Sequence, residues 1–159
     1  MPNTYTQLYV HVIFAVKSRR LLISNLWKDN LYKYITGIIT NKNQKLMIIN
    51  GMPDHLHLLI GLKPDCALSD LIRDVKAYSS KWINENKFVQ SKFEWQSGFG
   101  AFSVSKSGLN AVANYIANQE VHHQEVSFRK EFIRLLTEYE INFKEEYLLE
   151  GFGVAPTEL

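Results

Sequence analysis

GMPDHLHLLI, at residues 51–60, is the stretch around which the rest of this chain is organised. A short link joins two apolar runs, which predicts an antiparallel hairpin. Pro53 cannot donate a ladder hydrogen bond, so pairing is expected to resume at the histidines that follow it. Side chains alternate between the two faces of a strand, and His55 and His57 therefore face the same way and could hold one metal ion. Taken alone, the pair is equally typical of two surface histidines.

Length and composition indicate one globular domain. The chain has 159 residues, of which 46% are hydrophobic and 21% charged. These values predict a single domain over residues 1–159, with a core at about 4–125 and an acidic helical tail at about 126–159. No membrane partner is expected, because no apolar run is long enough to span a bilayer. Cys66 is the only cysteine and no secretory signal is expected, so the predicted location is cytoplasmic.

Charge is divided unevenly along the chain. Residues 1–119 carry 14 Lys and Arg against 7 Asp and Glu, whereas residues 120–159 carry 4 against 9. A basic domain suits phosphate-bearing partners such as nucleic acid, although basic charge is also found in domains that bind none.

The order of predicted elements indicates the fold class. Periodicity predicts strand, helix, strand, strand, helix, strand, in that order, before any further helix. This is the βαββαβ pattern of an α+β ferredoxin-like sandwich, with one antiparallel sheet and both helices on one face. The predicted ranges are 4–16, 24–41, 45–50, 55–62, 69–86 and 93–104, the last being one or two strands bent at glycines.

Two polar residues near the histidine pair have open roles. His11 lies on a largely apolar strand; it is either a satisfied core histidine or a residue that an adjacent strand brings to the site. Asp54 precedes His55 directly and is expected to be a turn residue, or to orient that histidine, rather than to be a ligand.

Basic residues form two groups along the sequence. Three of them end the first strand, and three lie on the polar face of the second helix. Each group could be a solvated surface, or it could contact a phosphate backbone, where Arg gives bidentate geometry and Lys a point charge. The candidates for such phosphate-backbone contacts are Lys17, Arg19, Arg20, Arg73, Lys76 and Lys81.

A third helix is expected over residues 109–122. Tyr115 and Gln119 are four residues apart on it and therefore share a face. By spacing alone, such a pair is more typical of amphipathic packing than of a functional site. A last helix over residues 127–139 is predicted to belong to the acidic packing tail.

The combined pattern resembles a known family. DHLHLL at residues 54–59 is similar to the His-hydrophobe-His (HUH) motif, and YIANQ at residues 115–119 is similar to the nucleophile helix of single-tyrosine HUH transposases. These enzymes belong to small bacterial insertion sequences and form the IS200-like family. The resemblance covers about residues 5–125, including the basic end of the first strand, and its two motifs are far more specific together than either is alone.

The resemblance implies a site and a chemistry. His55, His57 and Gln119 would bind a divalent metal, Mg²⁺ or Mn²⁺, and Tyr115 would be the catalytic nucleophile. Attack would leave a 5′-phosphotyrosine and a free 3′-OH, so that strands can later be rejoined. The implied partners are single-stranded DNA with hairpins and a second copy of the chain, as a homodimer with composite active sites.

Other functions remain possible at this stage. A host-retained relative that processes palindromic repeats would carry the same residues. A non-catalytic ferredoxin-like nucleic-acid binding module would explain the fold and charge, but not the joint presence of the histidine pair, the tyrosine and the glutamine. A phosphoesterase with paired His-x-Thr motifs is disfavoured because the sequence has neither motif.

Overall fold

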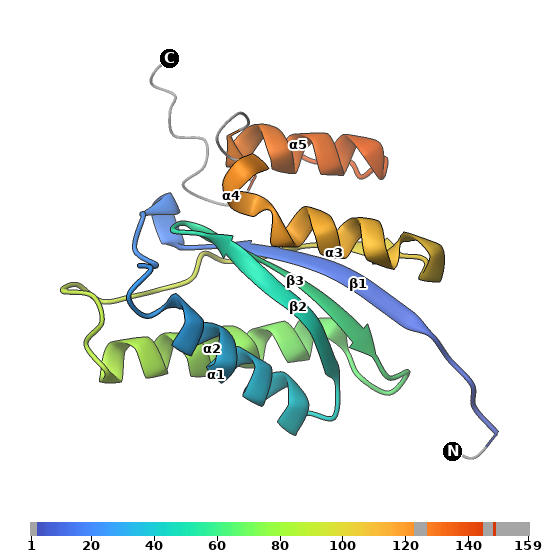
Figure 1. Ribbon diagram of the computed structural model, residues 1–159, viewed down its shortest axis with the longest axis horizontal. Helices are drawn as coiled ribbons and strands as arrows, with labels where there is room; N and C mark the ends of the chain where they lie inside the picture. Colours follow the sequence, from blue (N-terminus) through green and yellow to red (C-terminus); the bar gives the residue numbers. More distant parts are fainter. Residues whose placement is uncertain (1–2, 123–126, 145–147, 149–159) are drawn as a thin grey trace.

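One antiparallel sheet forms the centre of the protein. The computed structural model describes residues 3–122, 127–144 and 148 (Figure 1). The four strands lie in the order β2-β3-β1-β4, and every neighbouring pair is antiparallel. This is the strand order of a ferredoxin-like sheet, so the predicted α+β fold is confirmed. The strands are β1 Leu8–Ala15, β2 Lys45–Met52, β3 His55–Leu62 and β4 Gly100–Val104.

Helices cover both faces of this sheet (Figure 1). The two helices of the βαββαβ unit lie on one face, as predicted, and the C-terminal helices lie on the other. The first pair is α1 Lys28–Asn41 and α2 Leu68–Glu85, and the second group is α3 Leu109–Ala117, α4 Gln119–His122 and α5 Phe128–Glu138. None of the described helices is long and apolar enough to cross a membrane.

Alternation along β1 gives the protein a core on each face of the sheet. Val12 and Phe14 pack with the α1 and α2 side, whereas Ile13 and Ala15 pack with Phe102 and α5 on the other side. All four β1 side chains are fully buried. The strand is therefore apolar on both faces because each face is covered by helices.

Some predicted boundaries were wrong. β1 begins at Leu8 rather than residue 4, and α1 begins at Lys28 rather than residue 24. The Ser24 hydroxyl instead accepts a hydrogen bond from the Leu26 backbone N–H at 3.0 Å and so opens a turn before the helix.

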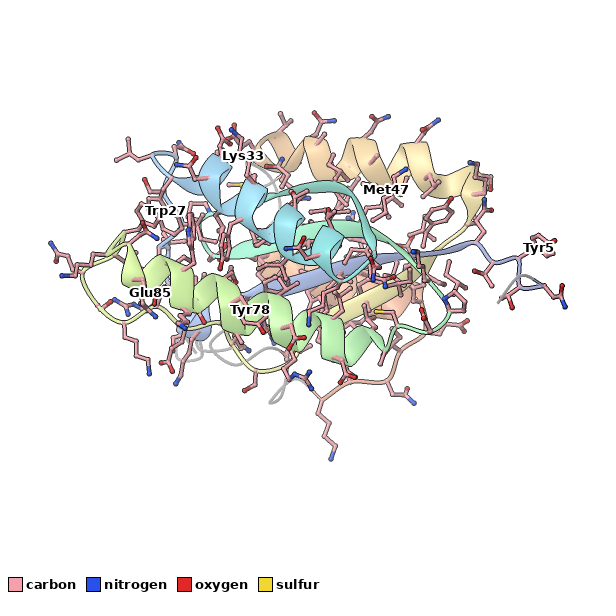
Figure 2. All side chains as sticks on the ribbon, turned by 90° about the horizontal axis from the view of Figure 1, so that it is seen from below. Tyr5, Trp27, Lys33, Met47, Tyr78 and Glu85 are labelled. Carbon is pink, nitrogen blue, oxygen red and sulfur yellow. The ribbon has the colours of Figure 1, made fainter. Side chains whose placement is uncertain are left out.

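Packing shows which of two adjacent residues of α2 belongs to the core. Ser79 is fully buried and accepts a hydrogen bond from Trp95 Nε1 at 2.9 Å, whereas Tyr78 is 49% exposed. Figure 2, which looks onto α1 and α2 from below, shows Tyr78 on α2. The Ser79 contact ties α2 to the segment before β4, which meets β1 through an isolated bridge between Trp95 and Val16. The predicted bend in that segment lies at Gly98, whose φ is 83°.

The tight hairpin between β2 and β3 has no room for a side chain at Gly51. A Cβ there would meet the backbone oxygen of His55 and, at 2.9 Å, the Cα of Leu56. These are backbone atoms, so relief would require a shift of the hairpin that carries the histidines. We expect Gly51→Ala to lower the free energy of unfolding by about 2 to 4 kcal/mol, as measured by urea denaturation.

The matched control for this substitution is Gly37→Ala in α1. A Cβ at Gly37 would have nothing within 4 Å, and Ala is the better helix former, so stability should rise by about 0.5 to 1 kcal/mol. Equal effects of the two substitutions would contradict the steric argument.

Candidate active site

The histidine pair lies on the sheet face that α3, α4 and α5 cover. His57 is paired with Ile13 of β1 and His55 with Ala15, and both imidazoles are fully buried. The side chains between and beyond them, Leu56 and Leu58, point to the opposite core. The alternation predicted from the sequence thus places both imidazoles side by side on one face.

Each imidazole has its Nδ1 held by a partner. His55 Nδ1 donates to Asp54 Oδ1 at 2.7 Å, and His57 Nδ1 lies 2.8 Å from His11 Nε2. Burial, followed by the nearby His57, lowers the pKa of His11 to about 3, so the His11 ring is neutral and can accept. These contacts leave both Nε2 atoms facing Gln119 and Glu131 within the cluster, and a polar partner at Nδ1 is the arrangement found around metal-bound histidines. Asp54 therefore has the orienting position, and His11 is brought to the site by strand pairing.

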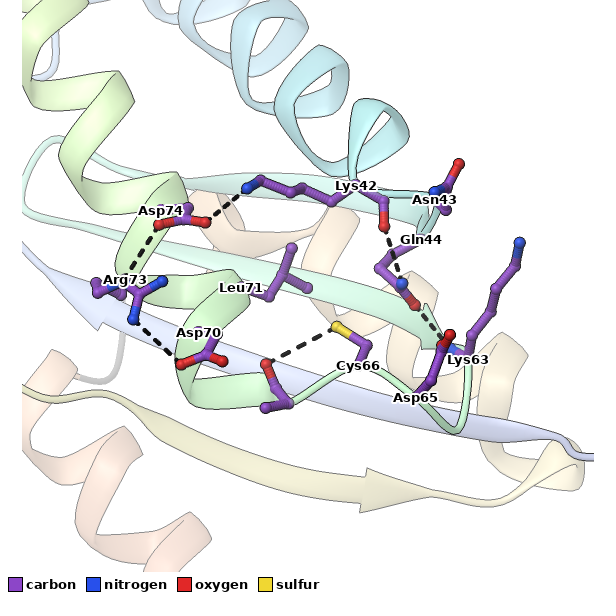
Figure 3. Close-up of a pocket in the computed structure, with 11 residues that line it drawn as sticks. Lys42, Asn43, Gln44, Lys63, Asp65, Cys66, Asp70, Leu71, Arg73 and Asp74 are labelled. Carbon is purple, nitrogen blue, oxygen red and sulfur yellow. Dashed lines mark hydrogen bonds and ion pairs between the residues drawn. The ribbon is translucent and has the colours of Figure 1, made fainter.

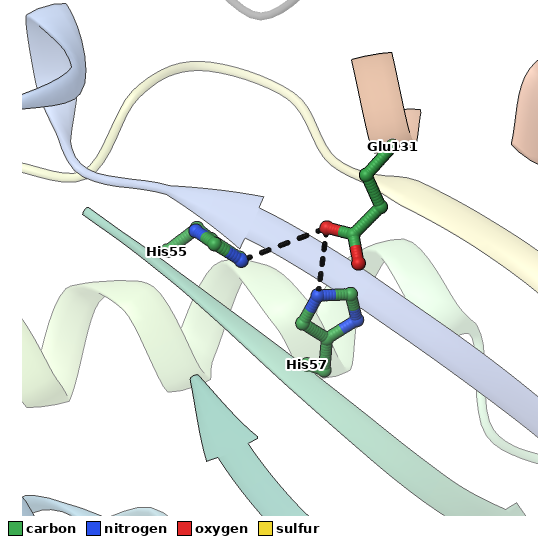
Figure 4. A group of neighbouring side chains, drawn as sticks. All are labelled: His55, His57 and Glu131. Atoms are coloured by element: carbon green, nitrogen blue, oxygen red, sulfur yellow. Dashed lines mark hydrogen bonds and ion pairs between the residues drawn. The ribbon is translucent and has the colours of Figure 1, made fainter. Parts of the chain in front are cut away.

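Oxygen atoms from two C-terminal helices complete the cluster. Glu131 Oε1 of α5 lies 3.2 Å from His57 Nε2 and 3.7 Å from His55 Nε2, as Figure 4 shows. Gln119 Oε1 of α4 lies 3.3 Å from His55 Nε2. All four side chains are fully buried. Two imidazoles, a carboxylate and a carboxamide oxygen are a donor set that fits a divalent ion.

Tyr115 stands next to this cluster. Its ring meets that of His57 edge-on, with centroids 5.8 Å apart, and its hydroxyl donates to Glu131 Oε2. Burial, and then the Glu131 carboxylate, raise the pKa of Tyr115 above its ordinary value. Without a bound cation the phenol thus stays protonated at neutral pH.

The helix that was predicted to carry both Tyr115 and Gln119 without interruption is in fact two helices. α3 ends at Ala117, Asn118 has non-helical φ and ψ of −102° and 28°, and α4 begins at Gln119. Asn50 of β2 donates to the backbone oxygens of Ile116 and Ala117 at 2.9 and 3.2 Å, which satisfies carbonyls at the end of α3. The break still leaves the Tyr115 and Gln119 side chains in contact with the cluster.

One group of predicted DNA contacts lies at the site end of the sheet. Lys17, Arg19 and Arg20 directly follow β1, whose last residue is paired with His55. Lys17 Nζ is 3.5 Å from Glu94, and Arg19 Nε is 3.9 Å from Asp54 Oδ2. Cations are therefore adjacent to the residue that orients His55.

The other group lies on α2, on the opposite face of the sheet. Arg73 is ion-paired with Asp70 and Asp74 at 3.2 Å each, at the rim of the pocket shown in Figure 3. Asp74 also pairs with Lys42 at 2.7 Å. This pocket is at the far end of β3 from His55, and these four charged groups satisfy one another. The structure thus does not bring the α2 cations to the histidines.

Lys76 differs from the other α2 cations because its ammonium is largely enclosed. Nζ donates to the backbone oxygen of Gln96 at 2.8 Å and to that of Gly98, and burial lowers its pKa to about 8 from 10.5. At a pH between about 8 and 10.5, the Lys76 amine is protonated in the unfolded chain but largely neutral in the folded one. The contribution of Lys76 to the free energy of unfolding therefore rises with pH over this range.

We expect Lys76→Met to remove this rise. Urea unfolding at pH 7.5 and pH 10 should show the wild type gaining stability relative to Lys76→Met as pH increases. Lys81→Met, an exposed position on the same helix, is the control and should track the wild type. Parallel pH profiles for the wild type and Lys76→Met would contradict the shifted pKa.

Glu131 is the site residue that the sequence analysis missed. It was placed in an acidic packing tail, yet it is fully buried and contacts both histidines. A signal was available: Phe128, Glu131, Phe132 and Leu135 follow helical spacing, so one acid stands within an apolar stripe. Buried acids of this kind are rarely without a partner.

Comparisons with known proteins point to one family. Residues 4–119 match a family model described as "Transposase IS200 like". The curated ISDra2 transposase TnpA of Deinococcus radiodurans is 25% identical over 119 residues, which cover 71% of this chain and 84% of that protein.

Two solved structures share the fold. A candidate transposase from Deinococcus radiodurans R1 superposes with a TM-score of 0.61 and 24% identity, covering 74% of this chain and 94% of that chain. A REP-associated tyrosine transposase bound to a REP hairpin gives a TM-score of 0.60 and 16% identity, covering 89% and 90%. At these identities the likeness shows the fold alone.

Proposed function

The chain belongs to the family of IS200-like transposases, which cut and transfer DNA, and from that premise we propose that it cleaves and rejoins single-stranded DNA through Tyr115. The observation that carries this proposal is the position of the Tyr115 phenol. Its hydroxyl donates to the carboxylate that also contacts His55 and His57, so nucleophile and ion site share one cluster.

His55, His57 and Gln119 are proposed to hold a divalent ion, Mg²⁺ or Mn²⁺. The convergence of both Nε2 atoms and the Gln119 carboxamide oxygen on one buried cluster supports this assignment. A divalent ion bound there would polarise the scissile phosphate and stabilise the charge that develops on its oxygens. A phenol with a pKa near ~10 is a weak nucleophile at neutral pH, so Tyr115 must also be activated by its surroundings.

The proposed reaction is a transesterification. Tyr115 Oη attacks the phosphorus, and the bond from phosphorus to the 3′ oxygen breaks. The phenol loses a proton and the leaving 3′ oxygen gains one, which gives a 5′-phosphotyrosine and a free 3′-OH. Because the phosphodiester energy is kept in the tyrosyl bond, a 3′-OH can attack it later and join two strands without ATP.

Hairpin-bearing single-stranded DNA is the proposed substrate. The REP-associated relative is bound to a hairpin, and in this chain three cations lie in the turn that follows β1. Lys17, Arg19 and Arg20 are the proposed backbone contacts nearest the site, with Arg73, Lys76 and Lys81 further away. Binding that rests on such contacts should weaken steeply as salt increases.

A homodimer and a cytoplasmic location remain proposals from the sequence. The resemblance implied composite sites, in which one subunit's tyrosine serves the other's histidines. In this single chain Tyr115 lies beside its own His57, so one chain holds both halves of a site. Exchange of helices between two copies would build an equivalent site.

Two other functions bear on the same residues. Processing of palindromic repeats would use the same chemistry, and the hairpin-bound relative favours keeping it as a second candidate. A binding module without catalysis is disfavoured because it leaves unexplained why two buried imidazoles, an acid and a carboxamide converge beside the Tyr115 hydroxyl.

The test is a trapping experiment. The protein is incubated with a labelled single strand carrying a hairpin, with Mn²⁺ or Mg²⁺, and run on a denaturing gel. The proposal predicts a protein–DNA adduct that depends on the divalent ion. Tight hairpin binding with no adduct under either ion would instead support the binding module.

A further inference from the structure

We propose that Glu131, on a helix beyond the family-matched segment, is a fourth ligand of the ion and the residue that positions the Tyr115 phenol against it. This inference rests on the proposed function, since it assigns a further role within the same site. The family model ends at residue 119, so neither role follows from that match.

Distances within the cluster support the ligand role. In octahedral coordination at about 2.1 Å, neighbouring ligand atoms are roughly 3.0 Å apart. Glu131 Oε1 is 3.2 Å from His57 Nε2 and 3.7 Å from His55 Nε2, and Gln119 Oε1 is 3.3 Å from His55 Nε2. The ligand atoms of His55, His57 and Glu131 all lie within 4.8 Å of one another. These separations are close to those of one coordination sphere.

The second oxygen of the same carboxylate supports the positioning role. Glu131 Oε2 accepts hydrogen bonds from Tyr115 Oη and, at 3.3 Å, from Gln119 Nε2. One oxygen therefore faces the ion site while the other faces the nucleophile. Because the carboxylate is rigid, it fixes the distance between the phenol and the ion.

Packing holds Glu131 in this place. Phe128, one turn earlier on α5, stacks on the His55 ring with centroids 3.8 Å apart and planes 4° from parallel. Ser127 caps the helix by accepting from the Lys130 backbone N–H at 3.3 Å. The acid is fully buried in an apolar stripe, a position where a bound cation compensates its charge.

The experiment compares Glu131→Gln, Glu131→Ala and Glu131→Asp with Glu138→Gln, an exposed acid on the same helix. Mn²⁺ affinity is measured by electron paramagnetic resonance titration without DNA, and cleavage of the hairpin substrate is measured separately. We expect Mn²⁺ affinity to fall at least about 10-fold in Glu131→Gln and further in Glu131→Ala. The kcat should fall about 100-fold while KM for DNA changes little, as expected when an interaction acts mainly in the transition state. Glu131→Asp should recover part of both losses, and Glu138→Gln should match the wild type.

Two results would overturn the inference. Wild-type Mn²⁺ affinity in Glu131→Gln and Glu131→Ala would show that the carboxylate is not a ligand. Faster cleavage in either variant would show that Glu131 occupies the place of the scissile phosphate instead. Glu131→Gln is nearly isosteric, so its circular dichroism and melting curve separate a folding defect from a site defect.

Failure of the proposed function would look different. If the wild type forms no adduct under any ion, cleavage by Tyr115 is wrong. The Mn²⁺ titration would still decide whether Glu131 is a ligand.

Discussion

Tyr115→Phe is expected to abolish adduct formation and to lower single-strand cleavage by at least about 10⁴-fold. The substitution removes only the hydroxyl that donates to Glu131 and leaves the ring that packs against His57. Folding and hairpin binding should therefore persist, which makes the loss specific to chemistry. Single-turnover cleavage of a labelled hairpin strand measures the rate, and circular dichroism with fluorescence anisotropy measures fold and binding.

The matched control is Tyr78→Phe. That residue is half exposed on α2, on the other side of the sheet from the cluster, and should cleave at the wild-type rate. Cleavage by Tyr115→Phe at a rate near wild type would remove Tyr115 as the nucleophile.

His57→Ala is expected to have the second largest effect, with Mn²⁺ affinity reduced by at least about 100-fold and cleavage lost. His57 is the centre of the cluster, since its Nδ1 bonds His11 at 2.8 Å and its Nε2 faces Glu131 at 3.2 Å. Removing it deletes one ligand and leaves the buried carboxylate with one contact fewer. Isothermal titration with Mn²⁺ measures the first effect and the gel assay the second.

Hairpin binding should be largely spared in His57→Ala, because the cations at the end of β1 remain. Arg20→Ala, in that basic group, should show the reverse pattern, with weaker DNA binding at high salt and unchanged Mn²⁺ affinity. Unchanged cleavage by His57→Ala would show that this imidazole holds no catalytic ion.

Local sequence patterns predicted most of the fold and the arrangement of the two histidines. The short link before Pro53 predicted the β2–β3 hairpin, and period-two alternation predicted that His55 and His57 share a face; both hold in the structure. Both features depend only on residues that are close together in the sequence, and sequence patterns can therefore predict them.

The remaining features depend on contacts between distant segments. The break at Asn118 lies where Asn50 of β2 donates hydrogen bonds to the last carbonyls of α3. Whether His11 was a core or a site histidine depended on the pairing of β1 with β3. Glu131 was missed because the charge of the tail as a whole was weighed, rather than the position of one acid within an apolar stripe. The roles of Tyr115 and Gln119 stay predictions, although the structure places both side chains at the cluster.

The central claim is that one tyrosine beside the ion site takes the DNA 5′ phosphate, and peptide mapping of the trapped adduct tests it most directly. Trypsin should release residues 107–129, a peptide in which Tyr115 is the only tyrosine. After nuclease digestion, tandem mass spectrometry should locate the added nucleotide phosphate on Tyr115. A nucleotide on another residue, such as Tyr139 in residues 135–144, would contradict the account.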